Sequence, residues 1–254
     1  MVNRRGYIWI FVVAVMVAGS LLGTGCNEGE NPVEPDIVLL DTANRVVVLR
    51  DSAITNSDPW NLYFFWLNLN DTLTKTMSFD PTVGNKYPGS IYSTANDQAR
   101  AQTFPEMGSD PNMDSIVGME YYLMAKSSAK TNFIAFLGKE GGSIRNSAYF
   151  VGIGFDKSDS IKMLWSSNAV AGQENKNLSP IQFDKWYKCT VEYNIITYTA
   201  TYYIDDKLVG THLMPSESTF GYNMFVVYRD GDGQDGPAPY YFNDLTLYKI
   251  LKKQ

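Results

Sequence analysis

Residues 186–213, WYKCTVEYNIITYTATYYIDDKLVGTHL, decide the fold class. In WYKCTVEYN, Cys189 alternates with polar neighbours and shares a face with Val191, and TYTATYYI continues the alternation. A period of two is the pattern of a half-buried β-strand, because successive side chains point to opposite faces of a sheet. Asp205 and Asp206 then separate TYTATYYI from KLVGTHL and predict a hairpin turn. The stretch therefore predicts consecutive antiparallel strands.

Similar strand patterns recur along the chain, whereas no segment after residue 36 keeps a helical period for long. They are VVVL at 46–49, WNLYFFWL at 60–67, IVGMEYYLMA at 116–125, NFIAFLG at 132–138, YFVGIGF at 149–155, IKMLW at 161–165, NMFVVYR at 223–229 and YYFNDLTLYKI at 240–250. The turn DKSDS predicts a hairpin between 149–155 and 161–165. Residues 78–113 hold four prolines and many polar residues, and we expect long loops there. Many short strands predict one all-β domain over residues 37–254, a jelly-roll sandwich of two antiparallel sheets.

The first 25 residues have the pattern of an export signal. Two arginines precede an apolar run from Tyr7 to Leu22, and small residues and a cysteine follow. The run is short for a membrane-spanning helix, which takes about 20 residues. The sequence from Leu22 to Cys26 resembles the lipobox of bacterial lipoproteins, with the leucine one place early. That resemblance implies cleavage before Cys26 and acylation of its thiol.

Two further features fit a protein held outside the cytoplasm. Residues 27–36, NEGENPVEPD, are acidic and rich in proline, so we expect residues 26–36 to be a solvated tether after the lipid. The resemblance to lipoproteins implies the outer membrane, because Asn27 stands where an aspartate commonly favours retention in the inner membrane. The predicted location is extracytoplasmic, with the lipid anchor as the contact with the membrane.

Charge and cysteine content narrow the classes of function. The net charge is −6, and no block of lysine and arginine occurs. A protein that binds nucleic acid needs a basic face for the phosphates, so this partner is excluded. The chain has two cysteines: Cys26 is assigned to the lipid, and Cys189 is predicted to be a small buried residue of the core.

The region from Trp186 onward resembles the concanavalin A-like lectin/glucanase superfamily, which includes laminin G-like modules. The resemblance lies in a tryptophan followed by a strand, in the hairpin Tyr203 to Val209, and in the late strand Phe242 to Leu247. The usual hairpin glycine is replaced by Asp206. The resemblance covers about a quarter of the chain and implies a concanavalin A-like jelly roll, a fold that hosts lectins, hydrolases, lyases and adhesion modules alike.

The sequence favours binding over catalysis. Glucanases of that superfamily place their acids on one strand as Glu-x-Asp-x-Glu, and no such motif occurs here. Glu120, Glu140 and Glu192 each stand without another acid at that spacing, and we expect solvent-facing acids at 120 and 192. The one histidine, His212, has no Gln-x-His motif around it such as related lyases use.

Acidic residues near the C-terminus are the metal candidates. Asp230, Asp232 and Asp235 lie in the loop DGDGQDG, and glycine-bent acidic loops supply oxygen ligands for calcium. Gln234 interrupts the pattern of an EF-hand, and a solvated turn is the alternative. Asp244 is a second candidate, because related sandwiches use a late-strand aspartate for a structural calcium, and a solvent-facing aspartate is the alternative. Structural calcium is the single cofactor that the sequence suggests.

A glycan is the ligand class that the sequence favours. Sugar binding needs an exposed aromatic platform with polar groups around it, and aromatic residues make up 14% of the chain. Candidate platform residues near loops or strand ends are Trp60, Trp66, Trp165, Tyr222 and Tyr228, and for each of them a place in the core of the sandwich is the alternative. The predicted function is a surface-anchored, lectin-like binding domain without catalytic activity. A structural or protein-interaction lipoprotein of the envelope and a diverged glycan hydrolase or lyase are the alternatives.

Overall fold

The structure of the chain is a computed structural model. It describes residues 45–52, 54, 61–64, 77–93, 99–103, 114–127, 132–138, 150–166, 174–214, 224–230 and 240–251. Contacts divide the chain into two units, Met1–Ile37 and Val38–Gln254, and every described residue belongs to the second. The predicted leader and tether therefore lie outside the described residues.

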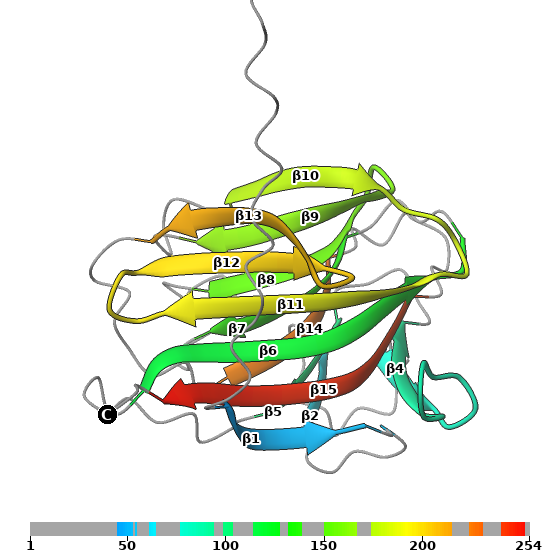
Figure 1. Ribbon diagram of the computed structural model, residues 1–254. Helices are drawn as coiled ribbons and strands as arrows, with labels where there is room; N and C mark the ends of the chain where they lie inside the picture. The colour runs from blue at the N-terminus through cyan, green and yellow to red at the C-terminus, as the bar shows by residue number, and fades with distance from the viewer. Residues whose placement is uncertain are drawn as a thin grey trace, which may run out of the picture. The chain divides into compact units, whose positions relative to one another are not determined.

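The described residues form two antiparallel sheets (Figure 1). The eight-stranded sheet has the order β13-β12-β11-β6-β15-β4-β3, with β1 also paired to β15. Its strands are β1 (Arg45–Asp51), β3 (Met77–Asp80), β4 (Ser90–Ser93), β6 (Asp114–Ala125), β11 (Trp186–Asn194), β12 (Thr199–Ile204), β13 (Lys207–Leu213) and β15 (Tyr240–Leu251). The seven-stranded sheet has the order β10-β9-β8-β7-β14-β5-β2. Its strands are β2 (Asn61–Phe64), β5 (Ala99–Thr103), β7 (Asn132–Gly138), β8 (Phe150–Asp156), β9 (Ser160–Ser166), β10 (Glu174–Pro180) and β14 (Met224–Asp230).

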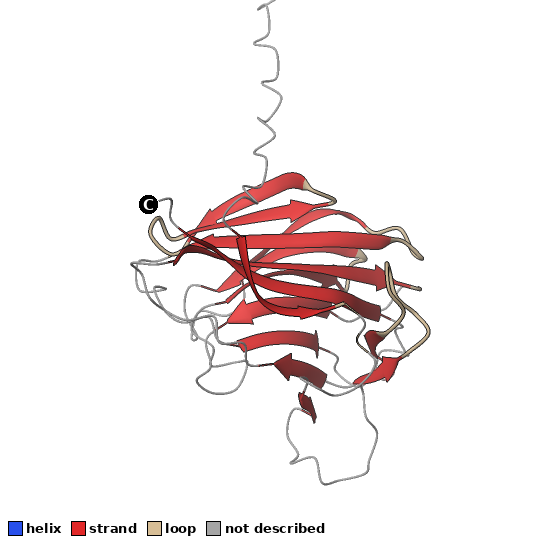
Figure 2. Ribbon diagram, turned by 60° about the horizontal axis from the view of Figure 1, so that its bottom comes forward, coloured by secondary structure: helices blue, strands red, loops and turns tan. Residues whose placement is uncertain are grey.

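The predicted all-β sandwich is confirmed. Figure 2 shows the two layers, which consist of strands and connecting loops in the described part of the chain. Consecutive hairpins build β7 to β10 in one sheet and β11 to β13 in the other. No helix among the described residues is long and apolar enough to cross a membrane. The alternation of the sequence therefore determined the fold class, because each sheet buries one face against the other.

The 205–206 turn shows why aspartates can occupy a hairpin tip. Asp205 and Asp206 have φ angles of 50° and 63°, in the left-handed region that a tight two-residue hairpin needs. Aspartate tolerates this region better than most residues because its short side chain can bond the local backbone. Here Asp205 Oδ1 accepts a hydrogen bond of 3.0 Å from the amide of Lys188. The aspartates thus fulfil the role of the glycine that related hairpins carry.

Residues 78–113 correct the sequence-based expectation of long loops. The structure forms β4 and β5 within this stretch and β3 at its start. These strands have four or five residues, and sequences such as ARAQT are too short and carry too few large apolar residues to stand out as strands. β5 pairs with β14 on one side and with β2 on the other. Backbone pairing with neighbouring strands holds these segments in the sheets. The hydrophobic pattern of the sequence therefore does not predict them.

The core lies between the sheets and is rich in aromatic residues. On β6, Val117, Met119, Tyr121, Leu123 and Ala125 alternate and are all buried in it. Cys189 on β11 is fully buried, as predicted, and burial raises the pKa of its thiol well above the ordinary value. This environment gives an unreactive thiol of the core.

Tyr121 connects the two sheets by hydrogen bonds as well as by packing. Its ring belongs to the eight-stranded sheet, and its hydroxyl reaches the backbone of β7 and β8 in the other sheet. The hydroxyl accepts from the amide of Ile153 at 2.9 Å, and the carbonyl oxygens of Ile153 and Ala135 lie 2.9 and 3.1 Å away as acceptors. Burial first, and Cys189 second, raise the pKa of Tyr121 well above its ordinary value, so the phenol stays neutral.

Replacing Tyr121 with phenylalanine should lower the free energy of unfolding by about 2 kcal/mol, because it removes the partner of a buried amide while keeping the ring. Urea unfolding followed by tryptophan fluorescence would measure the change. Tyr87→Phe is the matched control, because Tyr87 is 41% exposed and its loss of a hydroxyl should have little effect. Equal stability of Tyr121→Phe and the unmodified chain would contradict the proposed connection.

Candidate functional site

The outer face of the eight-stranded sheet, which faces the viewer in Figure 1, carries the polar and aromatic side chains of the candidate site. Because Tyr121 and Leu123 point into the core, the alternating positions Glu120, Tyr122 and Met124 of β6 point outward. The neighbouring strands β11 and β15 alternate in the same way. The registers in which β11 and β15 pair with β6 therefore determine which side chains lie next to one another on this face.

An aromatic row crosses the outer face at one end of the sheet. It consists of Trp186, Met124, Tyr241 and Tyr92, which are register partners on β11, β6, β15 and β4. Tyr92 and Tyr241 stack with ring centroids 5.7 Å apart and planes 15° from parallel. Trp186 and Tyr92 are half-buried, whereas Met124 and Tyr241 are buried. With strands about 4.8 Å apart, the row extends over about 14 Å.

A second row lies beside the aromatic row and is mixed in character. It consists of Lys188, Tyr122 and Asn243, again register partners on β11, β6 and β15. Tyr122 is half-buried, and Lys188 bonds Asp206 at 2.7 Å and Glu120 at 3.3 Å. Aromatic surface next to hydrogen-bonding groups is the combination that binds polar ligands with apolar faces.

Asn243 holds the loop 81–89 against β15. Its side-chain oxygen accepts from the amide of Asn85 at 3.0 Å, and its side-chain amide donates to the carbonyls of Gly89 and Tyr87. Asn243 itself is fully buried. The loop joins β3 to β4 and begins one residue after Asp80; Figure 1 draws it beside β4. Asn243 thus fixes the loop next to Tyr92 and the aromatic row.

The same loop is ordered from within. Asp80 Oδ1 accepts from the hydroxyl and the amide of Thr82 at 2.6 and 2.8 Å, and the amide of Gly89 donates to the carbonyl of Val83 at 3.1 Å. Gly89 has a φ of 114°, which a residue with a side chain rarely adopts. The exposed ring of Tyr87 lies near Lys86, whose Nζ is 5.4 Å from the ring centroid. The loop therefore offers a preformed aromatic and cationic edge.

An ionic cluster lies farther along the same outer face. The guanidinium of Arg45 stacks on the ring of Tyr248 at 3.6 Å and lies 3.7 Å from Glu120 and 3.9 Å from Glu192. The hydroxyl of Tyr248 donates to Glu192 Oε1 at 2.8 Å. Burial, followed by the charge of Glu192, raises the pKa of Tyr248. Arg45 therefore joins β1 to acids on β6 and β11.

Gly118 makes room for this cluster. A Cβ atom at position 118 would lie 2.3 Å from the Tyr248 ring, so the ring crosses β6 only because residue 118 has no side chain. Glu192 is 8% exposed rather than solvent-facing, which corrects the sequence-based expectation for this residue. The structure also brings Glu120 and Glu192 to one guanidinium, although no spacing in the sequence relates them.

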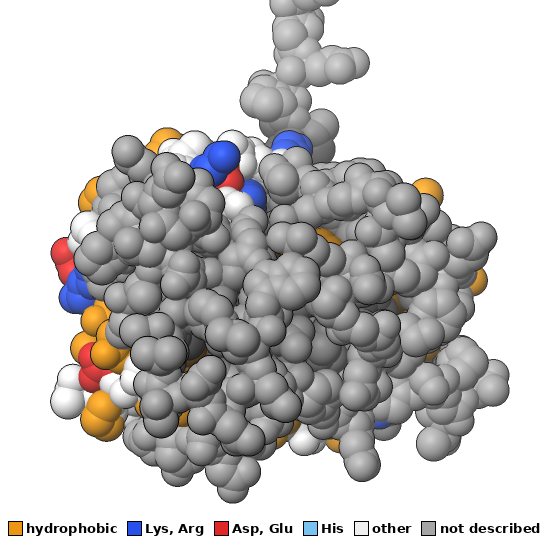
Figure 3. Space-filling model, turned by 180° about the vertical axis from the view of Figure 1, so that it is seen from behind, with side chains coloured by type: hydrophobic (Ala, Val, Ile, Leu, Met, Phe, Trp, Pro, Cys, Tyr) orange, Lys and Arg blue, Asp and Glu red, His pale blue; other side chains and the backbone are white. Residues whose placement is uncertain are grey.

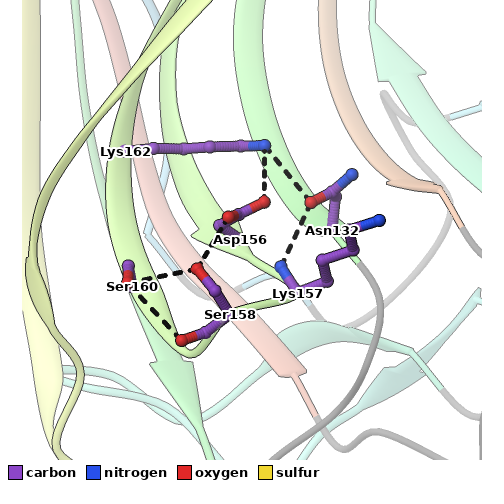
Figure 4. Close-up of polar contacts among 6 residues, drawn as sticks. All are labelled: Asn132, Asp156, Lys157, Ser158, Ser160 and Lys162. Carbon is purple, nitrogen blue, oxygen red and sulfur yellow. Dashed lines mark hydrogen bonds and ion pairs between the residues drawn. The ribbon is translucent and has the colours of Figure 1, made fainter.

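A buried lysine ties three strands of the seven-stranded sheet together (Figure 4). Lys162 is 2% exposed, and its Nζ contacts Asp156 Oδ1 at 3.0 Å and Asn132 Oδ1 at 3.2 Å. Ser158 donates to the other oxygen of Asp156 at 2.8 Å. Burial alone would raise the pKa of Asp156, but the bonds from Ser158 and Lys162 lower it. The carboxylate thus compensates the buried ammonium, and this cluster has a structural role.

The aromatic candidates from the sequence are different residues from this row. Trp60, Trp66 and Tyr222 lie outside the described residues. Trp165 lies on β9 opposite Val151, and Tyr228 lies on β14 opposite Ile134, both in the seven-stranded sheet. Their assignment to a ligand site stays a prediction.

The metal and lipid candidates also stay predictions. Asp232, Asp235 and Cys26 lie outside the described residues, and Asp230 ends β14. Asp244 lies at an irregularity of β15 with a φ of 55°. Across the described part of the chain, no three His, Cys, Asp or Glu side chains are grouped so that they could hold a metal ion.

The sequence predicts the strand positions of some residues of the aromatic row and of the row beside it. Trp186 was recognised as the residue before a strand, and Tyr122 and Tyr241 stood in recognised strands. Periodicity showed which residues share a face of one strand. It did not show which strands become neighbours, so Tyr92, Tyr241 and Trp186 were not grouped.

Space-filling Figure 3 shows the molecule from behind. Along its left edge, which corresponds to the right edge of Figure 1, charged and hydrophobic side chains of described residues lie next to one another. Figure 1 draws the loop 81–89 and the connection from β10 to β11 at this edge.

Comparisons with solved structures support the fold. A mutant of HCR/D matches with a TM-score of 0.51 and 9% identity, over 82% of this chain and 49% of that one. The binding domain of botulinum neurotoxin serotype C1 matches with a TM-score of 0.49 and 14% identity, over 70% and 44%. A sialidase matches with a TM-score of 0.43 and 12% identity, over 65% and 15%. The chain spans less than half the length of the neurotoxin proteins that it matches.

Comparison with protein-family models and with curated protein sequences finds no match. At such low identity, the structural similarity shows the fold alone. The match to the HCR/D mutant, with a TM-score above 0.5, agrees with the all-β sandwich of the described residues. The side chains of the candidate site are therefore the basis for a functional proposal.

Asn243→Ala should release the loop 81–89 while leaving the sheets intact, because three hydrogen bonds to the loop backbone depend on this side chain. Faster amide hydrogen exchange at residues 81–89, with unchanged exchange in β6 and β11, is the expected result. Asn194→Ala is the control, since that side chain caps the β11–β12 turn instead. Unchanged protection of the loop in Asn243→Ala would contradict its anchoring role.

Proposed function

We propose that this chain is a lipid-anchored binding protein of the cell envelope whose sandwich domain binds a glycan at the aromatic row. The aromatic row of Trp186, Met124, Tyr241 and Tyr92 is the observation that carries the proposal. In this mode, the flat apolar faces of sugar rings pack on aromatic rings, and their hydroxyls bond the polar groups beside them.

Three features support a preformed site rather than one that forms around its ligand. The row lies on paired strands, its two tyrosines are already stacked, and Asn243 fixes the loop beside it. A rigid platform loses little conformational entropy when a ligand binds. Half-buried Trp186, Tyr92 and Tyr122 keep part of each ring accessible to a ligand.

The contacts of two described glutamates on this face favour binding over hydrolysis. Glu120 contacts both Arg45 and Lys188, and Glu192 contacts Arg45 and the hydroxyl of Tyr248. Carboxylates engaged with cations in this way are suited to holding strands together. A general acid would need a raised pKa and access to the scissile bond. A diverged hydrolase or lyase, and a protein-interaction role, stay as alternatives that a glycan-binding experiment would separate from the proposal.

The membrane anchor is proposed from the sequence. The leader, the lipobox-like residues before Cys26 and the acidic tether 27–36 support acylation of Cys26 and attachment to the outer membrane. An anchored binding domain would hold a glycan at the cell surface or in the periplasm, where soluble binding proteins would diffuse away.

Trp186→Ala and Tyr92→Ala should each weaken glycan binding at least about tenfold, the effect of losing roughly 1.4 kcal/mol of contact energy. The full-length chain in mild detergent would be tested on a glycan array, and the affinity for a binding glycan measured by calorimetry. Both variants remove half-buried rings, so a melting temperature within a few degrees of the unmodified chain is expected.

The matched control is Ile196→Ala, which removes a 49% exposed hydrophobic side chain in the turn at the other end of β11. Its affinity should equal that of the unmodified chain. Full binding by both aromatic variants would place the glycan elsewhere on the protein, and no binding of any glycan by the unmodified chain would remove the proposed function.

Cys26→Ala should abolish incorporation of labelled palmitate and move the protein from the membrane fraction to the soluble fraction. The reason is that the proposed acyl chains hold the protein by burial of their methylene groups. Cys189→Ala is the control for labelling, because the thiol of Cys189 is buried in the core. Label that persists in Cys26→Ala would contradict the proposed anchor.

A further inference from the structure

Among the residues that the structure describes around the aromatic row and Tyr122, acidic side chains outnumber lysines. The six carboxylates belong to Asp80, Glu120, Asp184, Asp205, Asp206 and Asp244. The four lysines are Lys86 in the loop, and Lys126, Lys185 and Lys188. Even when Arg45, which contacts Glu120, is added to the lysines, the described side chains at this end of the sheet have a negative balance of charge.

Three of the lysines are already engaged by carboxylates. Lys126 Nζ lies 2.7 Å from Asp184 Oδ1, and Lys185 Nζ lies 3.0 Å from Asp205 Oδ2. These hydrogen bonds to carboxylates raise the pKa of both lysines. Lys188 is bound by two acids, Asp206 and Glu120. A ligand anion would have to compete with these partners for each ammonium group.

Asp80 lies on β3 two residues after Ser78, the register partner of Tyr92, so it adds negative charge close to the stacked tyrosines. Partial burial would raise the pKa of its carboxyl, but the hydrogen bonds from Thr82 and Val83 lower it, so Asp80 is ionised at neutral pH. Its charge contributes to the raised pKa of Tyr241, after burial as the larger cause. Within the described residues, no lysine or arginine forms an ion pair with it.

Asp244 has the same effect on Tyr122. Burial is the largest cause of the raised pKa of this tyrosine; Lys188 opposes the shift, and Glu120, Asp244 and Asp206 add to it. Among the ion pairs of the described residues, none includes Asp244. The stacked tyrosines and Tyr122 therefore each lie near a carboxylate that forms no ion pair with a described lysine or arginine.

We infer that the aromatic row selects uncharged glycans and rejects those that carry carboxylates or sulfates. The inference rests on the proposed function and names the ligand class of the same site. A sugar carboxylate placed on the row would be repelled by Asp80 and Asp244 and would lose hydration. In return it would gain only the ammonium group of Lys86, because carboxylates already hold the other three lysines. An uncharged sugar avoids both costs and can still donate hydroxyl protons to these carboxylates, which are strong acceptors.

The experiment compares each neutral polysaccharide with its own oxidised form. Glucan, mannan and galactan are used beside samples in which C6 hydroxyls have been oxidised to carboxylates, and affinity electrophoresis of the full-length chain measures binding. We expect the neutral form to bind at least about tenfold more tightly in about 0.02 M salt, where the Debye length is roughly 20 Å. The ratio should shrink in about 0.5 M salt, where that length is roughly 4 Å.

Charge-removing variants test the cause. The double variant Asp80→Asn with Asp244→Asn should reduce the neutral-to-oxidised ratio at least about threefold, because it removes two charges next to the rings. Asparagine keeps the size of both side chains and tolerates the left-handed backbone of residue 244. Asp159→Asn, in the β8–β9 turn of the seven-stranded sheet, is the charge-matched control and should leave the ratio unchanged.

The outcomes separate the two claims. Equal or tighter binding of the oxidised form, or an unchanged ratio in the double variant, would overturn the charge selectivity while leaving glycan binding in place. Binding of neither form of any polysaccharide by the unmodified chain would overturn the proposed function and the selectivity with it.

Discussion

The structure depends on the contact that Tyr121 makes across the sandwich. Its hydroxyl bonds Ile153 and Ala135 in the opposite sheet, so the inward face of β6 is fixed not by packing alone but by directed hydrogen bonds. Once residue 121 points inward, the pleat forces residues 120, 122 and 124 outward. The candidate site is built on those outward positions, so the same contact that joins the sheets determines what the outer face presents.

The outer face combines two kinds of interaction with different roles. Around Arg45, the ring of Tyr248 and two glutamates form a dense ionic cluster that ties the edge strand β1 to the centre of the sheet. Toward the other end, stacked rings and a fixed loop leave aromatic surface accessible. Partly buried charges need partners of opposite charge, so these side chains hold the strands together. Half-buried aromatic rings need no such partner, so they can stay accessible to a ligand. The glycan proposal follows from this division of the face.

Selectivity would then come from the border of the site rather than from the rings. Aromatic surface packs against neutral and charged sugars alike, but the carboxylates of Asp80 and Asp244 act on charge at a distance. Three of the four lysines nearby are paired with carboxylates, so they balance part of the field without offering free cations, and Lys86 is the exception. A site of this kind discriminates by repulsion, which needs no additional contact with the preferred ligand.

The sequence by itself determined the strands around residues 186–213, the hairpin at Asp205-Asp206, the core position of Cys189 and the sandwich class, because each follows from alternation or from local turn geometry. It missed β3, β4, β5 and β10, whose short or polar segments are held by ladder pairing with neighbours. Only the tertiary structure placed Tyr92, Tyr241 and Trp186 in one row and gathered Arg45, Glu120 and Glu192. The physical reason is that a period of two specifies which residues share a face of a strand, whereas the pairing of distant strands decides which of those faces meet.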